Sequence, residues 1–508
     1  MKKVLIANRG EIALRVIRAC KELGIASVAV YSDADARAPH VREADEAVRL
    51  GPPPSSESYL RGDLIIEAAR QIGADAIHPG YGFLSEREWF ARAVREAGLI
   101  WVGPPAEAIA AMGSKTAART LAVAHDVPVV PGTTEPLRDA AEAATIAERY
   151  GYPVLLKAAA GGGGKGMRVV RDPSAMASSL EAAQREAMNA FGDDAVYVEK
   201  YIEGPRHVEI QVLADAHGRC VSLGERECSV QRRHQKMIEE APSPAVNAEL
   251  RKAMGSAAVR VAKAAGYQNA GTCEFLLAPD GQFYFLEMNT RIQVEHPVTE
   301  FVTGIDLVQW QLRIAAGERL PFTSSIDPRG WAMECRITSE DAANSFLPST
   351  GRIDYLRIPG GPGVRWDSGV GVGSEVTLFY DPMLAKLIVW APTRDDAIAR
   401  MHRALDELSI QGIETSREFH LRVMEDDEFR RGAIDIQWLE RRLDSLVNAP
   451  SPREQMVAAA IAAALLAERD RQRRAPRGAA GAPASGDAAL PEQQPWARLA
   501  RQRGLRDA

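Results

Sequence analysis

Glu287-Met288-Asn289-Thr290-Arg291-Ile292-Gln293-Val294-Glu295-His296 lies near the middle of the chain and follows a predicted β-hairpin. The first strand of that hairpin is Gly271-Thr272-Cys273-Glu274-Phe275-Leu276-Leu277, and the second covers residues 283–287. Both strands are rich in β-branched and aromatic residues, and Pro279-Asp280-Gly281 between them is a turn sequence. A two-residue loop at Asp280-Gly281 places Glu274 directly opposite Glu287.

Two facing carboxylates about 5 Å apart repel each other and weaken a hairpin. A divalent cation between them removes the repulsion, and a set of hard oxygen ligands favours Mg²⁺ or Mn²⁺ over zinc. A period of two would place further polar side chains on the same face, namely Asn289, Arg291, Gln293 and Glu295. The pattern predicts a site that activates an anion against a phosphate. The alternatives are an exposed polar strand face whose charges cancel, and a register shifted by Pro279.

The chain has 508 residues, which is enough for about three domains, and its composition of 46% hydrophobic and 26% charged residues is that of an ordinary globular protein. A net charge of -6 and a pI near 6.0 give no general electrostatic reason to bind nucleic acid or an anionic membrane. The five cysteines form no CxxC pair and predict a reducing cytoplasm. We expect no signal peptide and no bilayer-spanning segment, because the apolar runs are short.

Residues 1–112 alternate strand and helix, which predicts an α/β domain with a parallel sheet. Asn8 and Glu11 have the spacing of a helix capping box. The first β-α-β unit lacks the G-x-G-x-x-G of dinucleotide-binding folds, and this argues against dinucleotide binding. Loops at the carboxyl ends of parallel strands carry ligands, and this makes Tyr81 and Gly82 candidates for substrate contact, although two glycines can also form a plain turn.

Residues 113–203 begin with a helix that Lys115 opens, and a hinge follows at residues 127–132. The next strand, residues 154–157, leads into four consecutive glycines at positions 161–164. Their spacing does not fit the G-x-x-x-x-G-K-[ST] phosphate loop. We predict a mobile flap over phosphates, in which backbone N–H groups, Lys157 or Lys165 meet the charge; a glycine linker is the alternative.

Residues 204–445 form a third predicted region of strands and helices. Its basic segment, Gln231 to Lys236, is either a solvated surface or a site for phosphate or bicarbonate, and Cys228 is predicted to be a packed thiol. Residues 446–508 form a tail: a capped, Ala-rich helix from Ser451 to about Arg474, a disordered stretch over residues 475–495, and a short amphipathic segment at Trp496. The helix and the last segment are either docking elements or a vestigial tail.

The motifs and their order resemble biotin carboxylase, an ATP-grasp enzyme found alone or as the first part of acyl-CoA and pyruvate carboxylases. The resemblance covers residues 1 to about 445. It implies a fold of the α/β and α+β classes: a parallel-sheet N-terminal domain, a small lid domain with the glycine flap, and a C-terminal mixed-sheet domain.

The resemblance also implies a role for each matching residue. The metal ligands would be Glu274 and Glu287 with Asn289 nearby. ATP phosphates would meet Lys115, Lys157, His234 and the flap with Gly162, Gly163, Gly164 and Lys165; adenine would meet Glu199, Lys200 and Ile202; the ribose would meet His207 and Gln231. Bicarbonate would lie against Arg291, Gln293 and the backbone of Val294 with Lys236 close by, Glu295 would be the base, and biotin would lie near Arg336, Tyr81 and Gly82.

The implied reaction is ATP-dependent carboxylation of biotin with bicarbonate through carboxyphosphate, the first half-reaction of an acetyl-CoA or other acyl-CoA carboxylase. Biotin would arrive on a separate carrier protein, because the chain contains no Ala-Met-Lys-Met hairpin. The other expected partners are carboxyltransferase subunits and a second copy in a homodimer. Two departures from the family pattern are Ala159-Ala160 before the flap and Pro362 near the expected dimer contact. The competing functions are another ATP-grasp ligase that joins a carboxylate to an amine, and a non-catalytic scaffold subunit.

Overall fold

We analysed a computed structural model of the chain. It describes residues 1–133, 136–158, 167–322, 326–448 and 452–474. The chain divides into two compact units, Met1–Ala449 and Pro450–Ala508.

The N-terminal part of the first unit is a five-stranded sheet in which every strand pair is parallel. Its strand order is β3 (Glu46–Gly51), β2 (Ala26–Ser32), β1 (Lys3–Ile6), β4 (Ala76–His78) and β5 (Ile100–Trp101). One α-helix follows each strand along the chain: α1 (Gly10–Glu22), α2 (Pro39–Glu43), α3 (Gly62–Gln71), α4 (Glu88–Glu96) and α5 (Ala106–Gly113). The α/β prediction for this region is confirmed.

The capping box predicted for α1 is wrong. The helix begins at Gly10 after Arg9, and no side chain caps it. The Asn8 side-chain amide donates instead to the backbone carbonyls of Pro79 and Tyr81, each at 2.7 Å. Glu11 is buried and accepts a hydrogen bond from the Tyr81 hydroxyl. Both side chains therefore hold the loop after β4, and neither caps helix α1.

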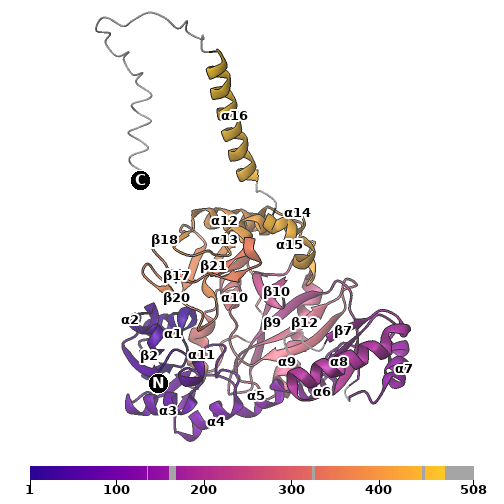
Figure 1. The fold of residues 1–508 in the computed structure, drawn as a ribbon. Coiled ribbons are helices and arrows are strands. Elements are labelled where there is room, and N and C mark those ends of the chain that lie inside the picture. Colours follow the sequence, from indigo (N-terminus) through magenta and orange to yellow (C-terminus); the bar gives the residue numbers. More distant parts are fainter. Residues whose placement is uncertain (134–135, 159–166, 323–325, 449–451, 475–508) are drawn as a thin grey trace, which may run out of the picture. The chain divides into compact units, whose positions relative to one another are not determined.

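A small antiparallel sheet follows, with the order β7 (Met167–Val170), β6 (Val154–Ala158) and β8 (Val196–Lys200). Helices α7 (Ala140–Tyr150) and α8 (Met176–Phe191) pack on it at the right of Figure 1. Helix α6 (Lys115–Ala124) precedes this part, and Ser114 caps it. The predicted flap, with Gly162, Gly163, Gly164 and Lys165, lies outside the described residues.

The third part is built on an eight-stranded sheet with antiparallel strand pairs. Its order is β13 (Phe283–Asn289), β12 (Asn269–Leu277), β9 (Arg206–Ala214), β10 (Cys220–Arg232), β11 (Gln235–Ala241), β14 (Trp331–Thr338), β21 (Met383–Ala391) and β19 (Val364–Ser368). An isolated parallel bridge joins Val129 to Phe285 at the β13 edge. Small two-stranded sheets link β15 (Glu340–Asp341) to β16 (Leu347–Pro348), β17 (Gly351–Arg352) to β20 (Glu375–Val376), and β18 (Tyr355–Arg357) to β22 (Ser409–Gln411).

Helices cover this sheet. They are α9 (Ala248–Ala264), α10 (His296–Thr303), α11 (Leu307–Ala315), α12 (Arg394–Glu407), α13 (Arg417–Glu425), α14 (Asp427–Arg430) and α15 (Trp438–Asn448). Along β9, Val208, Ile210 and Val212 share an apolar cluster with residues of α9. The alternating residues His207, Glu209 and Gln211 must point to the opposite face. The period of two thus separates a core face from a polar face.

The hairpin of β12 and β13 pairs Glu274 with Glu287, as predicted, but the predicted two-residue loop is wrong. The Ala278 amide donates to the Gln282 carbonyl, so the loop contains three residues, 279–281. Phe275 then pairs with Phe285, and the register shifts by one residue before Glu274. Leu286 is the extra residue of this bulge, and it restores the predicted glutamate pair.

The continuous polar row predicted after Glu287 is also corrected. Strand β13 ends at Asn289, residues 290–295 leave the sheet, and α10 begins at His296. The basic segment forms the β10–β11 hairpin, in which Gln231 pairs with Lys236. Arg233 and His234 occupy its turn with positive φ angles of 50° and 65°.

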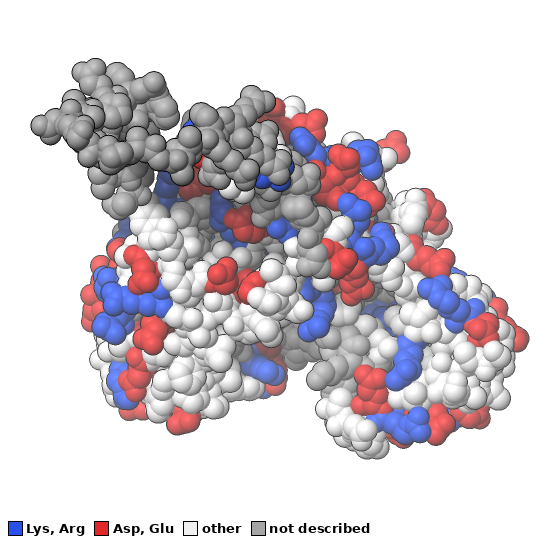
Figure 2. Space-filling view, turned by 45° about the horizontal axis from the view of Figure 1, so that its top comes forward, with Lys and Arg blue, Asp and Glu red and all other residues white. Residues whose placement is uncertain are grey.

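The described part of the second unit is one helix, α16 (Pro452–Arg474), whose extent agrees with the prediction. Ser451, the disordered stretch predicted for residues 475–495 and the Trp496 segment lie outside the described residues. Among the described helices, none has the length and apolar character needed to cross a bilayer. Acidic and basic side chains are interspersed on the face drawn in Figure 2.

Candidate active site

A row of four charged residues crosses four neighbouring strands of the eight-stranded sheet. Glu287 on β13 faces Glu274 on β12, Glu274 faces Glu209 on β9, and Glu209 faces Arg226 on β10. Arg226 is fully buried and forms an ion pair with Glu209. A buried guanidinium is tolerated only when its donors are satisfied. The other donors reach Gln211, Thr299, Thr272 and Gln293 at 2.7–3.1 Å.

Lys236 joins three carboxylates from different parts of the chain. Its ammonium group lies 2.6 Å from Glu209, 3.0 Å from Glu274 and 2.7 Å from Glu295. Burial disfavours the charged form of Lys236, but the three carboxylates outweigh burial and raise its pKa well above the usual value. Lys236 is therefore a fixed positive charge at the centre of the site.

Glu295 lies between two cations. Besides Lys236, Arg336 Nη2 donates to Glu295 Oε2 at 2.9 Å, and Arg336 Nε donates to Glu239 Oε1 at 2.6 Å. Burial would raise the pKa of Glu295, but Lys236, Arg336 and Arg226 together lower it well below its usual value. Burial raises the pKa of Glu239 to about 7. Glu295 is thus an ionised carboxylate, which is the form that can accept a proton.

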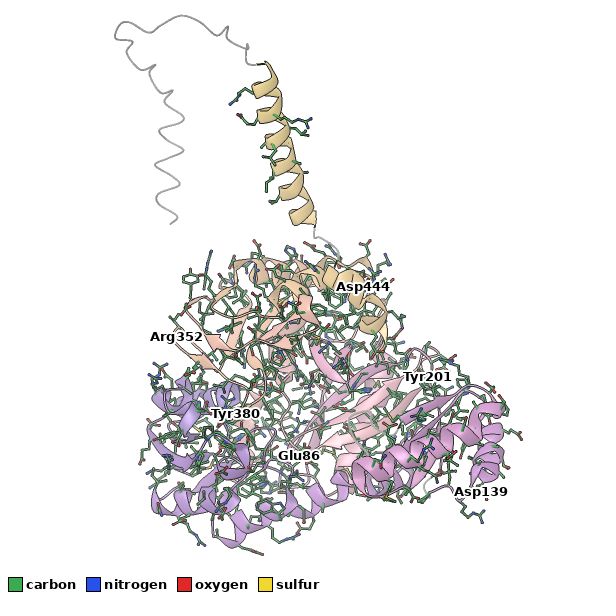
Figure 3. The ribbon with its side chains drawn as sticks, viewed as in Figure 1. Glu86, Asp139, Tyr201, Arg352, Tyr380 and Asp444 are labelled. Carbon is green, nitrogen blue, oxygen red and sulfur yellow. The ribbon has the colours of Figure 1, made fainter. Side chains whose placement is uncertain are left out.

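Asn289, Arg291 and Gln293 form a connected polar cluster near Lys236, although strand β13 ends at Asn289. Gln293 Nε2 and Asn289 Nδ2 both donate to Glu274 Oε1 at 2.9 Å. Arg291 Nη2 donates to the Asn289 side-chain oxygen at 3.2 Å, and Arg291 Nε donates to Glu86 Oε2 at 3.0 Å. Figure 3 marks Glu86 where the N-terminal elements meet the large sheet. The predicted anion-binding groups Gln293 and Arg291 are therefore linked to Glu274, Gln293 directly and Arg291 through the Asn289 side chain.

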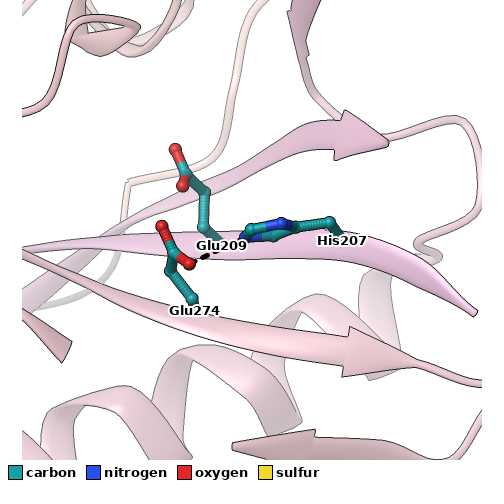
Figure 4. Close-up of side chains that lie close together, drawn as sticks. All are labelled: His207, Glu209 and Glu274. Carbon is teal, nitrogen blue, oxygen red and sulfur yellow. Dashed lines mark ion pairs between the residues drawn. The ribbon is translucent and has the colours of Figure 1, made fainter. Parts of the chain in front are cut away.

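His207 and Gln231, predicted beside a ribose, are in contact. Gln231 Nε2 lies 2.7 Å from His207 Nδ1, and His207 Nε2 lies 3.1 Å from Glu274 Oε2. Figure 4 shows this imidazole with Glu209 and Glu274.

The residues predicted beside adenine and phosphates form a second group on the small sheet. Glu199 binds Lys157 and, at 3.3 Å, Arg119. Lys200 donates to the Gly151 carbonyl at 2.8 Å, and Ile202 follows β8. His234 is exposed at the β10–β11 turn, so the structure does not bring it into the polar cluster.

The residues predicted to hold a metal ion are suited to that role. Asn289 and Glu287 belong to one strand, and Glu274 faces Glu287 across the hairpin. Partial burial and the nearby charge of Glu274 raise the pKa of Glu287, and the Lys115 ammonium is 4.0 Å from its carboxylate. Oxygen donors with excess negative charge fit Mg²⁺ or Mn²⁺. Glu209 also lies within ligand distance of Glu274 and His207.

Tyr81 and Gly82 lie in the loop after β4, where Gly82 has a positive φ of 68°. Six residues that support this loop and the central carboxylates were not predicted from the sequence. They are Glu11, Glu86, Glu209, Arg226, Glu239 and Lys386. The alternation of His207, Glu209 and Gln211 with apolar residues was a usable signal for Glu209.

Comparison with known proteins assigns this constellation to a family. Three family models match in order: "Biotin carboxylase, N-terminal domain" at residues 1–109, "Carbamoyl-phosphate synthase L chain, ATP binding domain" at 114–323, and "Biotin carboxylase C-terminal domain" at 334–441. The biotin carboxylase of Haemophilus influenzae is 53% identical over 445 residues, which are 87% of this chain and 99% of that protein. The chain belongs to the biotin carboxylase family. The resemblance seen in the sequence is therefore confirmed.

Other members of the biotin carboxylase family are similarly close to this chain in sequence and in structure. Biotin carboxylase 1 of Bacillus subtilis is 52% identical over 442 residues, which cover 87% of this chain and 98% of that one. The structure is similar to the biotin carboxylase domain dimer of Hydrogenobacter thermophilus 2-oxoglutarate carboxylase, solved with MgADP, ADP and bicarbonate. That similarity has a TM-score of 0.81 and 48% identity, and covers 88% of this chain and 98% of the other. The predicted ATP-grasp fold is confirmed.

Proposed function

We propose that this chain carboxylates biotin, using ATP and bicarbonate, as the first half-reaction of an acyl-CoA carboxylase. The observation that carries the proposal is the ionised Glu295 held between Lys236 and Arg336. Relatives that match this chain over almost their own full length support the proposal, and so does the bicarbonate bound in the Hydrogenobacter structure.

The proposed chemistry begins with proton transfer from bicarbonate to Glu295. A bicarbonate oxygen then attacks the γ-phosphorus of ATP, the bond to ADP breaks, and carboxyphosphate forms. Arg291, Gln293 and Lys236 would orient the anion and stabilise its charge. When Mg²⁺ is bound by Glu274 and Glu287 with Asn289 nearby, it supplies charge neutralisation for the phosphates.

Carboxyphosphate then releases CO₂ and phosphate. Phosphate takes the proton from the biotin N1 nitrogen, and that nitrogen attacks CO₂ to form carboxybiotin. Arg336 would stabilise the negative charge on the ureido oxygen, and Tyr81 and Gly82 would contact the biotin ring. Lys115, Lys157 and His234 would meet the phosphates, together with the flap residues outside the described part of the chain.

The remaining assignments follow the same proposal. Glu199, Lys200 and Ile202 would contact adenine, and His207 and Gln231 the ribose. The proposed domain limits are 1–112, 113–203, 204–445 and 446–508. The family models at residues 1–109 and 334–441 support the first limit and the end near residue 445, whereas the model at 114–323 spans the limit at 203. All five cysteines are free, which supports a reducing cytoplasmic compartment.

The proposed partners are a separate biotin carrier protein, carboxyltransferase subunits and a second copy of the chain. The dimer of the Hydrogenobacter domain supports the last of these. Intact mass of the chain from a biotin-replete host tests the separate carrier, because a covalent biotin adduct would refute it.

The decisive experiment measures ATP cleavage and carboxybiotin formation with and without bicarbonate and free biotin. We expect cleavage to require bicarbonate and carboxybiotin to require biotin. An amine-dependent ATP cleavage would support the other class of ATP-grasp ligase, and no cleavage at all would support a scaffold.

A further inference from the structure

Lys386 is a buried lysine in the middle of strand β21, in the sequence Met383-Leu384-Ala385-Lys386-Leu387-Ile388. Its side chain has no solvent exposure. In the sheet it pairs with Arg336 of β14 on one side and with Asp367 of β19 on the other. An ammonium group is retained in such a place only when specific partners compensate for its lost hydration.

Two of its partners come from parts of the chain that are remote in sequence. Lys386 Nζ donates to the backbone carbonyl of Val294 at 2.8 Å. The same nitrogen lies 3.2 Å from Glu11 Oε1 in helix α1. The Val294 carbonyl belongs to the peptide bond that enters Glu295. Because a peptide unit is planar, a hydrogen bond that holds this carbonyl also restrains the Glu295 Cα atom at the other end of the unit.

Glu11 extends the connection to the substrate loop after β4. Its carboxylate accepts a hydrogen bond from the Tyr81 hydroxyl, and the Asn8 amide donates to the Tyr81 carbonyl at 2.7 Å. The β19–β20 connection approaches the same point, because a Cβ atom at Gly369 would lie 2.8 Å from the Glu11 backbone nitrogen. The N-terminal loop, the C-terminal strand and the segment that carries Glu295 thus meet at one buried ion pair.

We propose that Lys386 and Glu11 act as positioning residues, which hold the Val294–Glu295 peptide in place and tie it to the Tyr81 loop. The inference rests on the proposed function, because it assigns the pair to the base of that reaction. Residues 290–294 lie between β13 and Glu295, the N-cap of α10, so they belong to neither element. The Glu295 carbonyl accepts from the Val298 amide at 3.3 Å, whereas the Val294 carbonyl accepts from Lys386. The Lys386 ammonium holds the backbone carbonyl of Val294, the last residue before Glu295.

The test compares two isosteric changes that each remove the charge of a buried carboxylate. Glu11→Gln weakens the proposed ion pair. Glu225→Gln is the matched control: Glu225 is buried on β10, and its described partners, Arg251 at 2.7 Å and the Ser243 amide at 3.3 Å, do not belong to the candidate site. Lys386→Met is the stronger perturbation and is used only if its far-UV circular dichroism matches that of the wild type.

We expect Glu11→Gln to raise the KM for bicarbonate about tenfold while the KM for ATP changes less than twofold. Glu225→Gln should leave both constants unchanged. A general structural defect would alter both constants or lower kcat alone, so the split between the two constants separates positioning from stability. An unchanged bicarbonate KM in Glu11→Gln would overturn the inference.

A second measurement does not depend on activity. Hydrogen exchange, followed by mass spectrometry on the peptide that contains residues 289–298, should be about tenfold faster in Glu11→Gln than in the wild type or in Glu225→Gln. Equal exchange in the three proteins would overturn the positioning role, even if the wild type cleaves no ATP. If the wild type cleaves no ATP but exchange is faster in Glu11→Gln, the missing activity refutes the proposed function and the exchange result still supports the positioning role.

Discussion

Removal of one charge from the pair Glu274 and Glu287 should stabilise the metal-free protein but weaken metal binding. Opposed residues in an antiparallel pair have Cβ atoms about 5 Å apart. Two unit charges at that distance repel by about 3 kcal/mol at an effective dielectric constant near 20. Because the Glu287 side chain is 42% exposed, water and salt reduce this repulsion to about 1 kcal/mol. Glu287→Gln should therefore stabilise the metal-free protein by about 1 kcal/mol, which is a rise of about 1 °C in Tm for a unit of this size.

With metal present, the same change should have the reverse effect. Loss of one anionic ligand should raise the Mg²⁺ concentration needed for ADP-dependent stabilisation and for ATP cleavage by about tenfold, or about 1.4 kcal/mol. Excess Mg²⁺ should partly restore cleavage.

Thermal unfolding in EDTA and over a Mg²⁺ series with fixed ADP measures both effects. Glu375→Gln, an exposed carboxylate on strand β20, is the control and should change neither. A Glu287→Gln variant with a lower metal-free Tm, or with an unchanged Mg²⁺ dependence, would refute the metal-pair reasoning.

Three further predictions concern the base, its neighbour and acid stability. Glu295→Gln should lower bicarbonate-dependent ATP cleavage at least about 100-fold, because the base acts before phosphoryl transfer. Arg336→Met should retain part of that cleavage but form little carboxybiotin, and equal loss of both activities in both variants would contradict this division. Stability should fall as pH drops from 6.5 to 4, because burial lowers the pKa of His40, His78 and His420 to about 4 each. These residues stay neutral in the fold while the unfolded chain binds protons below pH 6.5, so the steepest slope is about 4 kcal/mol per pH unit. Urea denaturation at pH 7.5 and 5.5 measures it, and equal free energies of unfolding at both pH values would count against the reasoning.

The hairpin shows how far local sequence predicts the fold and where it fails. Strand propensity and the turn residues identified both strands correctly. The loop length was wrong by one residue, and the bulge at Leu286 compensated for it, so the glutamate pair was correct through two cancelling errors. A bulge is set by packing across the sheet, here the edge-on contacts of Phe275 with Phe283 and Phe285. Strand propensity and turn residues do not predict such packing between strands, so they could not predict the bulge.

The support of the site was harder to predict because it depends on strand order. Strands β11, β14 and β21 are neighbours in the sheet but lie about 50 to 90 residues apart in sequence. Lys386 therefore had no visible partner, and neither did Glu239. One general signal was available: a lysine inside an otherwise apolar strand must have a buried partner. That signal identifies Lys386 as important without naming Glu11 or the Val294 carbonyl.

The cations of the site differ in exposure, and that difference separates their roles. The side chain of Arg226 is 0% exposed and that of Lys236 is 12% exposed, whereas Arg291 is 21% and Lys115 is 50% exposed. The two inner cations are bound by several protein groups each, so their positive charge is already balanced and their positions are fixed. Lys115 lies 4.0 Å from one carboxylate and loses little when a phosphate replaces that contact. Substitution of an inner cation should therefore disturb geometry and stability together, whereas substitution of Lys115 should weaken phosphate binding and leave the fold intact.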